Sequence, residues 1–268
     1  MVVQYARLNP TGNMTAIVTS PVPRAEQPRV AARLMARGGA FAEQVAFLEG
    51  AALPGARIRL QMMGGEFCGN ASMSLAALLA LGDGLADGVE ATYPLEVSGA
   101  EGLVNCRVRR EGASFRGTVE MPLPEEILEA ELFSGTALPL VRFPGIAHAI
   151  VPEAMLEPEA AQARIPALCE ELNADAMGLL LTDANFTRMR PLVYVRATNS
   201  AVWEHGCGSG TAALGAYAAA RSGRDAALAV SQSGGTICVR AVWRQGAVRK
   251  IEISGRVTLE ETGEAELS

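Results

Sequence analysis

Short stretches in which apolar and polar residues alternate recur along the whole chain. Alternation with a period of two is typical of strands that bury one face and expose the other. The stretches are rich in Val, Ile, Leu and Thr, so each predicts a half-buried strand. They are Met14–Ser20, Arg57–Met62, Leu103–Arg109, Gly117–Met121, Leu192–Val195, Thr236–Val242 and Val248–Ser254.

Segments with helical patterns lie between these stretches. They are about Gln27–Arg37, Ala71–Leu81, Ala160–Leu172 and Thr211–Arg221. The second and fourth consist almost wholly of small and apolar residues, and a helix with so little polar surface is buried on most sides. The pattern therefore predicts an α/β (α+β) fold, with a sheet or barrel wrapped around a central helix in each half of the chain.

The two halves resemble each other in the order of their motifs. Arg7-Leu8-Asn9-Pro10 precedes Ala16-Ile17-Val18, and Arg142-Phe143-Pro144-Gly145 precedes Ala149-Ile150-Val151. In each half a glycine-flanked cysteine, a helix and a Ser/Gly turn follow. This order predicts a duplicated unit and two pseudo-symmetric domains.

A domain boundary is expected near Met121–Pro124, where Pro122 and Pro124 interrupt a strand. We expect an N-terminal domain of residues 1–120 that carries the first cysteine motif. A strand at about 255–268 returns to that domain. Residues 121–254 are expected to form a C-terminal domain with the second motif.

The composition excludes several classes of protein. Of the 268 residues, 49% are hydrophobic, which provides for a large core, and the net charge of −6 with no Lys/Arg cluster argues against a nucleic-acid partner. No apolar stretch is long enough to span a membrane, and the start of the chain lacks the pattern of a signal peptide. We therefore expect a cytoplasmic protein, and an odd number of cysteines, five, fits a reducing compartment.

The chain also lacks the residues that cofactor chemistry usually requires. Lys250 is its only lysine and lies in a strand-like stretch, so a Schiff base with pyridoxal phosphate is not expected. The two histidines, His148 and His205, belong to no HExxH motif, and no CxxC is present, so no metal site is expected. Side chains alone are expected to perform the chemistry, without a cofactor.

Two cysteines occupy near-identical settings, Phe67-Cys68-Gly69-Asn70-Ala71 and Gly206-Cys207-Gly208-Ser209-Gly210-Thr211. Each follows a turn-prone stretch and opens a predicted helix. A thiol at a helix N-terminus meets the positive end of the helix dipole, which is expected to lower its pKa. In contrast, Cys106, Cys169 and Cys238 lie in regular patterns and are expected to be structural.

Two such thiols suit the inversion of an α-carbon. A single base tends to return the proton to the face that it came from. A thiolate on one face and a thiol on the other can remove and deliver a proton, and they exchange roles in the reverse direction. The backbone amides of residues 69–71 and 208–210 can hold the substrate carboxylate. The pair therefore predicts a racemase or epimerase acting on a small-molecule substrate.

Four blocks of the sequence resemble the diaminopimelate epimerase superfamily. That superfamily pairs a Cys-Gly-Asn motif with a Cys-Gly-Ser/Thr-Gly motif, on two pseudo-symmetric α/β domains that close on the substrate. Within it, the chain is most similar to the histidine racemases of staphylopine-type metallophore biosynthesis. The blocks are Asn9-Pro-Thr-Gly-Asn-Met-Thr15, Glu43-Gln44-Val45, Gly65-Glu-Phe-Cys-Gly-Asn-Ala71 and Trp203-Glu-His-Gly-Cys-Gly-Ser-Gly-Thr211.

The resemblance implies a role for individual residues. Cys68 and Cys207 would be the acid–base pair, and Glu204 would meet the substrate ammonium. Asn13 and Gln44 would line the pocket, and Glu43 is a candidate to receive a basic side chain such as imidazole, from charge complementarity. The carboxylate-binding amides would come from Gly69, Asn70, Gly208 and Ser209. The resemblance also implies a homodimer.

Departures from the diaminopimelate epimerase pattern bear on the substrate. His205 stands where those enzymes carry an Arg for the distal carboxylate, the segment Gln61–Glu66 is shortened, and Gly145-Ile146-Ala147-His148 lacks the usual Asn. A site for a second charged terminus is therefore not expected. An amino acid with one α-centre is favoured, with histidine first by similarity.

Other functions remain open at this stage. Diaminopimelate epimerase itself, a proline or hydroxyproline epimerase and an itaconate-type isomerase share the fold. A substrate without an amino group offers no positive charge to the carboxylate of Glu204, which weighs against the isomerase. A non-catalytic amino-acid-binding protein is the alternative from another class, and retention of both cysteines argues against it.

Overall fold

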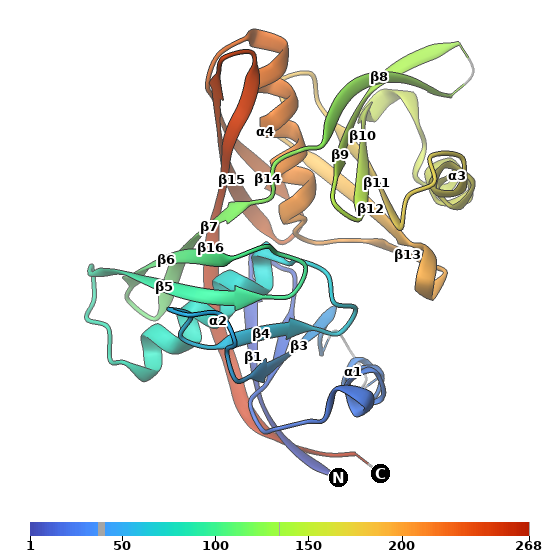
Figure 1. Ribbon diagram of the computed structural model, residues 1–268. Coiled ribbons are helices and arrows are strands. Elements are labelled where there is room, and N and C mark those ends of the chain that lie inside the picture. The colour runs from blue at the N-terminus through green and yellow to red at the C-terminus, as the bar shows by residue number, and fades with distance from the viewer. Residues whose placement is uncertain (37–40, 134, 268) are drawn as a thin grey trace. The chain divides into compact units, whose positions relative to one another are not determined.

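The computed structural model describes residues 1–36, 41–133 and 135–267 (Figure 1). The chain divides into two compact units, each with its own core. Unit 1 comprises Met1–Glu120 and Ser254–Ser268, and unit 2 comprises Met121–Ile253. The last strand, β16 (Ala247–Glu266), therefore contributes residues to both units.

Unit 1 is a sheet that closes on itself around one helix. Its strands follow the order β1-β2-β3-β4-β5-β6-β7-β16, and β16 also pairs with β1. Helix α2 (Gly69–Gly82) contacts β1, β2, β5 and β6, and ten of its 14 residues are buried. The strands are β1 (Val2–Pro10), β2 (Thr15–Val18), β3 (Gln44–Glu49), β4 (Arg59–Met62), β5 (Glu90–Val97), β6 (Leu103–Glu111) and β7 (Ser114–Met121).

A second helix of unit 1, α1 (Gln27–Met35), packs on β3 and follows a short 3₁₀ turn, Arg24–Glu26. Its buried face, which includes Val30 and Leu34, belongs to one hydrophobic cluster with Phe47 of β3. The sequence predicts this helix over 27–37. The observed helix ends at Met35, and residue 37 lies outside the described residues.

Unit 2 contains a six-stranded sheet of order β13-β12-β11-β10-β9-β8 and the hairpin β14-β15. Helix α3 (Pro158–Glu171) packs on β11 to β13, whereas α4 (Gly208–Ser222) contacts β9, β10, β14 and β15. The strands are β8 (Glu126–Phe133), β9 (Thr136–Phe143), β10 (Ile146–Pro152), β11 (Ala176–Thr182), β12 (Met189–Val195), β13 (Ser200–Trp203), β14 (Ala226–Gln232) and β15 (Gly235–Arg244), with 3₁₀ turns at Glu153–Met155 and Arg196–Thr198.

The two units repeat one order of elements. Unit 1 contains β1, β2, α1, β3, β4, α2, β5 and β6, and unit 2 matches it with β9, β10, α3, β11, β12, α4, β14 and β15. The pairing repeats as well, because β2–β3 and β10–β11 are parallel whereas β3–β4 and β11–β12 are antiparallel. The predicted fold, with two pseudo-symmetric halves each built on a central helix, is confirmed.

All the predicted strands are present, and their ends differ by a few residues except in β16, which continues to Glu266 instead of ending at Ser254. Some of the other strands carry no alternation. The clearest case is β11, in which every residue after Ala176 is buried. β11 is an inner strand of its sheet, and α3 packs on one of its faces. Because neither face of the strand is exposed, polar residues do not alternate with apolar ones along it. Alternation therefore fails to mark β11.

Candidate active site

Cys68 is the N-cap residue of α2. Its Sγ accepts a hydrogen bond from the backbone N–H of Ala71 at 3.4 Å. The hydroxyl of Ser72 in turn donates to the carbonyl oxygen of Cys68 at 2.8 Å. The thiol is therefore held at the positive end of the central helix of unit 1.

Cys207 has the same place in unit 2. It is the N-cap residue of α4, and its Sγ accepts from the N–H of Gly210 at 3.3 Å. The hydroxyl of Thr211 donates to the Cys207 carbonyl at 2.7 Å. Both contacts have the sequence offsets found at Cys68, three and four residues, so the two cysteine settings are structural equivalents.

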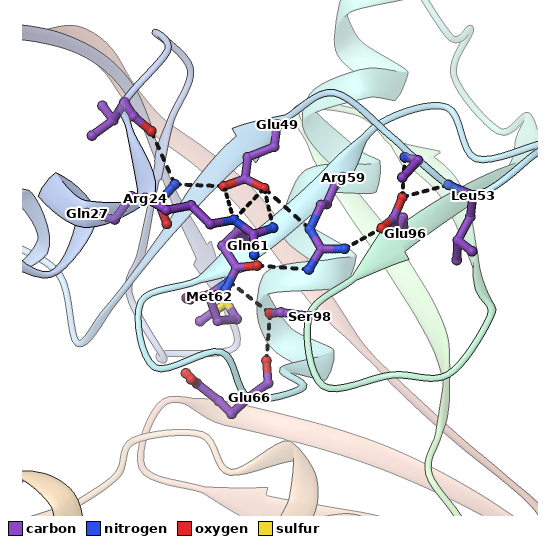
Figure 2. Close-up of polar contacts among 12 residues, drawn as sticks. Arg24, Gln27, Glu49, Leu53, Arg59, Gln61, Met62, Glu66, Glu96 and Ser98 are labelled. Carbon is purple, nitrogen blue, oxygen red and sulfur yellow. Dashed lines mark hydrogen bonds and ion pairs between the residues drawn. The ribbon is translucent and has the colours of Figure 1, made fainter.

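The loops that lead into the two cysteines are anchored alike. The hydroxyl of Ser98, just after β5, donates to the carbonyl of Glu66 at 2.9 Å (Figure 2). In unit 2, the N–H of Gly234, between β14 and β15, donates to the carbonyl of His205 at 2.8 Å. Each accepting residue lies two positions before its cysteine, so the hairpin turn after the cysteine helix positions the loop before it.

The turn at Ser98 packs closely on this loop. Gly99 has φ +70°, and a Cβ at this position would lie 2.3 Å from the backbone nitrogen of Phe67. Only glycine has both the conformation and the space for this approach. Ser98 also accepts from the N–H of Met62 at 2.9 Å, which links the turn to the end of β4.

A network of charged side chains extends from the same region of unit 1 (Figure 2). The guanidinium of Arg59 bonds to Glu96, and donates to Gln61 at 2.9 Å. Glu96 also accepts from the N–H groups of Ala52 and Leu53, at 2.6 and 2.9 Å. These backbone N–H groups and then Arg59 hold the pKa of Glu96 below its usual value. The network therefore joins β4, β5 and the loop before β4.

Gln44, one of the predicted pocket residues, contacts the first cysteine directly. Its Oε1 lies 3.1 Å from Cys68 Sγ, and its Nε2 donates to the hydroxyl of Thr15 at 2.7 Å. Thr15 donates in turn to the carbonyl of Asn13 at 3.0 Å, and Asn13 is buried. The structure therefore connects Asn13, Gln44 and Cys68 through one chain of contacts.

Cys207 lies in a more enclosed setting, with 2% of its surface exposed. Burial, and after it the carboxylate of Glu204, raise the pKa of its thiol well above the usual value. Contacts from Ser209 and from the N–H of Gly210 act in the opposite direction. The expectation of a lowered pKa is therefore wrong for Cys207, because the cost of desolvating a thiolate exceeds the contribution of the helix end.

The remaining predicted residues lie just before β3, just after β13 and at the first residues of α2 and α4. Glu43 immediately precedes β3, and its backbone N–H donates to the carbonyl of Met14 at 2.8 Å. Glu204 follows β13, with its N–H bonded to the carbonyl of Pro191 at 3.0 Å. The expected carboxylate-binding amides belong to the first two residues of α2 and α4, namely Gly69, Asn70, Gly208 and Ser209.

Two further properties concern the described residues only. They contain no group of three or more His, Cys, Asp and Glu side chains that could hold a metal ion. None of the helices built from them is long and apolar enough to cross a membrane.

Comparisons with known proteins relate this site to a family. Residues 2–265 match the family model described as the N-terminal domain of the histidine racemase CntK. A histidine racemase of Fusobacterium nucleatum is 32% identical over 238 residues, covering 87% of this chain and 88% of that protein. The chain belongs to the histidine racemase family. The prediction of an isomerase, made on the cysteine pair and the flanking blocks, is thereby confirmed.

Two other relatives extend the family assignment to almost the full length and to the fold. A histidine racemase of Staphylococcus aureus is 30% identical over 274 residues, covering 98% of this chain and 97% of that protein. The structure of a predicted epimerase from Pseudomonas aeruginosa has a TM-score of 0.73 at 19% identity, covering 99% of this chain and all of that one. The fold of this family member is therefore the diaminopimelate epimerase-like fold.

Sequence patterns did not find every residue around the second cysteine of this family member. His148 of β10 is fully buried, and its Nε2 lies 3.0 Å from the Ser209 hydroxyl, although the sequence analysis gave it no place in the site. One signal was present: His148 precedes Ala149-Ile150-Val151 as Thr15 precedes Ala16-Ile17-Val18. Since Thr15 belongs to the contacts around Cys68, the repeat itself pointed to His148.

Proposed function

We propose that this chain is a cofactor-independent racemase that interconverts L- and D-histidine, with Cys68 and Cys207 as its two acid–base groups. The observation that carries the proposal is the equivalence of the two cysteines. Each is the N-cap of the central helix of its unit, and each Sγ accepts the N–H three residues later. The names of relatives that are about a third identical support histidine as the substrate.

In the proposed reaction, the thiolate of one cysteine removes the α-proton and the thiol of the other delivers a proton to the opposite face. Backbone N–H groups at the N-terminus of a helix favour anions, so those of Gly69, Asn70, Gly208 and Ser209 are suited to hold the substrate carboxylate. Charge that develops on the carboxylate during proton removal is stabilised by the same groups.

Glu204 has a second effect in this scheme. Its carboxylate raises the pKa of Cys207, as burial does. A substrate ammonium bound to Glu204 would neutralise this charge, so substrate binding lowers the barrier to forming the Cys207 thiolate. Binding of an amino acid would then remove the contribution of Glu204, while that of burial remains.

The test uses reduced protein in deuterated water, with histidine, diaminopimelate, proline and hydroxyproline as substrates. Exchange of the α-proton is followed by NMR, and inversion by chiral chromatography. Exchange with histidine alone is expected. Exchange with diaminopimelate in place of histidine would contradict the assignment of histidine as the substrate. No exchange with any of the four would favour the binding-protein alternative.

Cysteine variants test the two-base assignment. Cys68→Ala and Cys207→Ala are each expected to lower kcat by a factor of about 10² to 10⁴, the usual contribution of a general acid or base. Cys238→Ala is the matched control, because Cys238 is a partly buried free thiol in β15. A cysteine variant with the activity of the control would contradict the assignment. The metallophore pathway and the homodimer remain predictions of the resemblance, and the cytoplasmic location remains a prediction of the composition and of the sequence pattern.

A further inference from the structure

His148 lies behind the second cysteine and contacts it through one side chain. The imidazole Nε2 is 3.0 Å from the hydroxyl oxygen of Ser209, and that oxygen is 3.5 Å from the Sγ of Cys207. Ser209 is the second residue of α4, whereas His148 belongs to β10. Three side chains from two elements of unit 2 therefore form one chain of contacts that ends at the thiol.

The imidazole in this chain is neutral. Its exposed fraction is 0%, and burial lowers the pKa of His148 to about 3. Within the described residues, its Nδ1 has no hydrogen-bond partner. The ring of Phe143 packs on it edge-on, with centroids 6.3 Å apart. The only polar contact of this neutral ring in the described part of the chain is with the Ser209 hydroxyl, so the ring can fix the orientation of that hydroxyl.

The two units differ at this position of the repeat. In unit 1 the parallel partners are Thr15 of β2 and Gln44 of β3, and Gln44 reaches Cys68 itself. In unit 2 the equivalent partners are His148 of β10 and Gly178 of β11. In unit 1 the polar side chain that contacts the cysteine belongs to the second strand of the parallel pair, β3. In unit 2 the polar side chain that is linked to the cysteine belongs to the first strand, β10.

We propose that His148 is a positioning residue that directs the hydroxyl of Ser209 to the sulfur of Cys207, and that Ser209 and Gln44, the neutral side chains in contact with the two thiols, have opposite effects on their ionisation. This inference rests on the proposed function of Cys207. With Nε2–H donating to Ser209 Oγ, the hydroxyl hydrogen is directed to sulfur, a contact that favours the thiolate. At Cys68, Oε1 of Gln44 accepts from the thiol, a contact that favours the protonated form.

The orientation of Gln44 supports this difference. Its Nε2 is occupied by the hydroxyl of Thr15 at 2.7 Å, and this leaves Oε1 for Cys68. A carbonyl oxygen stabilises a neighbouring thiol and repels a thiolate. At Cys207 the Ser209 hydroxyl thus acts against burial and the Glu204 carboxylate, which raise the pKa of that thiol, whereas Gln44 stabilises the protonated form of Cys68.

The experiment measures the ionisation of Cys207 without substrate. Thiolate formation is followed by ultraviolet absorbance against pH, as the difference between each protein and its Cys207→Ser counterpart. The variants are His148→Leu, which removes the polar contact at similar size, and His148→Gln, whose amide N–H can replace Nε2–H. Both are also made in a Ser209→Ala background. The carboxylate of Glu204, the charged group in contact with Cys207, is present throughout.

His148→Leu is expected to raise the midpoint of Cys207 ionisation by about one pH unit, a tenfold change, while His148→Gln retains the original midpoint. In the Ser209→Ala background, neither substitution should move the midpoint further. A shift that persists without the Ser209 hydroxyl, or no shift with His148→Leu, would overturn the proposal. Circular dichroism and thermal melting confirm that each variant is folded.

Failure of this inference and failure of the proposed function give different results. The midpoint is measured on the enzyme alone, so it reports the contact chain whether or not Cys207 takes part in catalysis. If Cys207→Ala retains racemase activity while His148→Leu shifts the midpoint, the positioning role of His148 is supported and the catalytic assignment of Cys207 is wrong. If Cys207→Ala is inactive and the midpoint does not move, His148 has no positioning role.

Discussion

Gly178 lies opposite His148 on the neighbouring parallel strand and leaves the space that the imidazole fills. A Cβ at position 178 would lie 2.1 Å from Nδ1 of His148 and 2.7 Å from its Cε1. A Cβ atom does not approach other heavy atoms so closely in real structures, so a side chain at 178 must displace the ring. The glycine of β11 is thus a condition for the contact between His148 and Ser209.

Gly178→Ala should therefore reproduce the effect of His148→Leu on the ionisation of Cys207. Forcing a methyl group into this packed position is expected to cost about 1–3 kcal/mol of stability, measured by urea denaturation. The matched control is Gly50→Ala, since a Cβ there would have no atom within 4 Å. An unchanged Cys207 midpoint in Gly178→Ala would show that the ring is free to adjust without losing Ser209.

His148 should also make the stability of the protein depend on pH. In the unfolded chain the imidazole takes up a proton below its usual pKa of 6.5, whereas in the folded state its pKa is lowered to about 3. The unfolded state then binds more protons between these values, so this contribution to stability is complete above 6.5 and is lost as the pH falls towards 3.

At about pH 5.5, one unit below the unfolded pKa, wild-type protein should have lost about 1.4 kcal/mol of this contribution relative to neutral pH. His148→Gln should not show the loss, because an amide does not titrate. Urea denaturation of both proteins at the two pH values measures the difference. Parallel pH dependence of the two would mean that the folded protein protonates His148 readily.

The anchor at Ser98 should matter for the first cysteine. Ser98→Ala removes the acceptor for the N–H of Met62 and the donor for the carbonyl of Glu66. Groups left without a partner cost about 1–3 kcal/mol each when buried, and the loop that leads to Cys68 loses its connection to the hairpin turn. We expect kcat/KM to fall by about tenfold or more.

Ser114→Ala is the matched control for this substitution. Ser114 is also a buried serine at a hairpin, and its hydroxyl donates to the carbonyl of Glu111 at 3.0 Å. It lies at the start of β7 and has no contact with the loop before Cys68 among the hydrogen bonds of the described residues. Equal losses of activity in the two variants would indicate general destabilisation, and the anchor would have no special role.

The charged network of unit 1 should contribute to acid sensitivity. The N–H groups of Leu53 and Ala52, and then Arg59, lower the pKa of Glu96 below 4.5. A carboxylate with a lowered folded pKa stabilises the protein above its unfolded pKa, and the contribution is lost as the pH falls through the folded value. Glu96→Gln should be less stable than wild type at neutral pH, with a difference that shrinks below about pH 4.5. Thermal melting across this range provides the comparison.

The equivalence of the two cysteine settings was visible in the sequence because helix N-termini depend on local residues. A small residue with an acceptor atom, followed by glycine and a run of helix formers, marks the start of α2 and of α4 without any distant contact. The same local blocks placed the chain in its family. The central helices were predictable for a similar reason, since their lack of polar residues already implied burial.

Tertiary structure decided which side chains reach each cysteine. Cys207 and His148 lie 59 positions apart in the chain, and the bond from His148 to Ser209 depends on the pairing of β10 with β11 and on the space at Gly178. The raised pKa of Cys207 has the same origin, because desolvation depends on the whole packing of unit 2 around α4. Local sequence determined where the two thiols stand, and non-local packing determined how readily each one loses its proton, because the electrostatic environment of a buried group is the sum of contacts from distant parts of the chain.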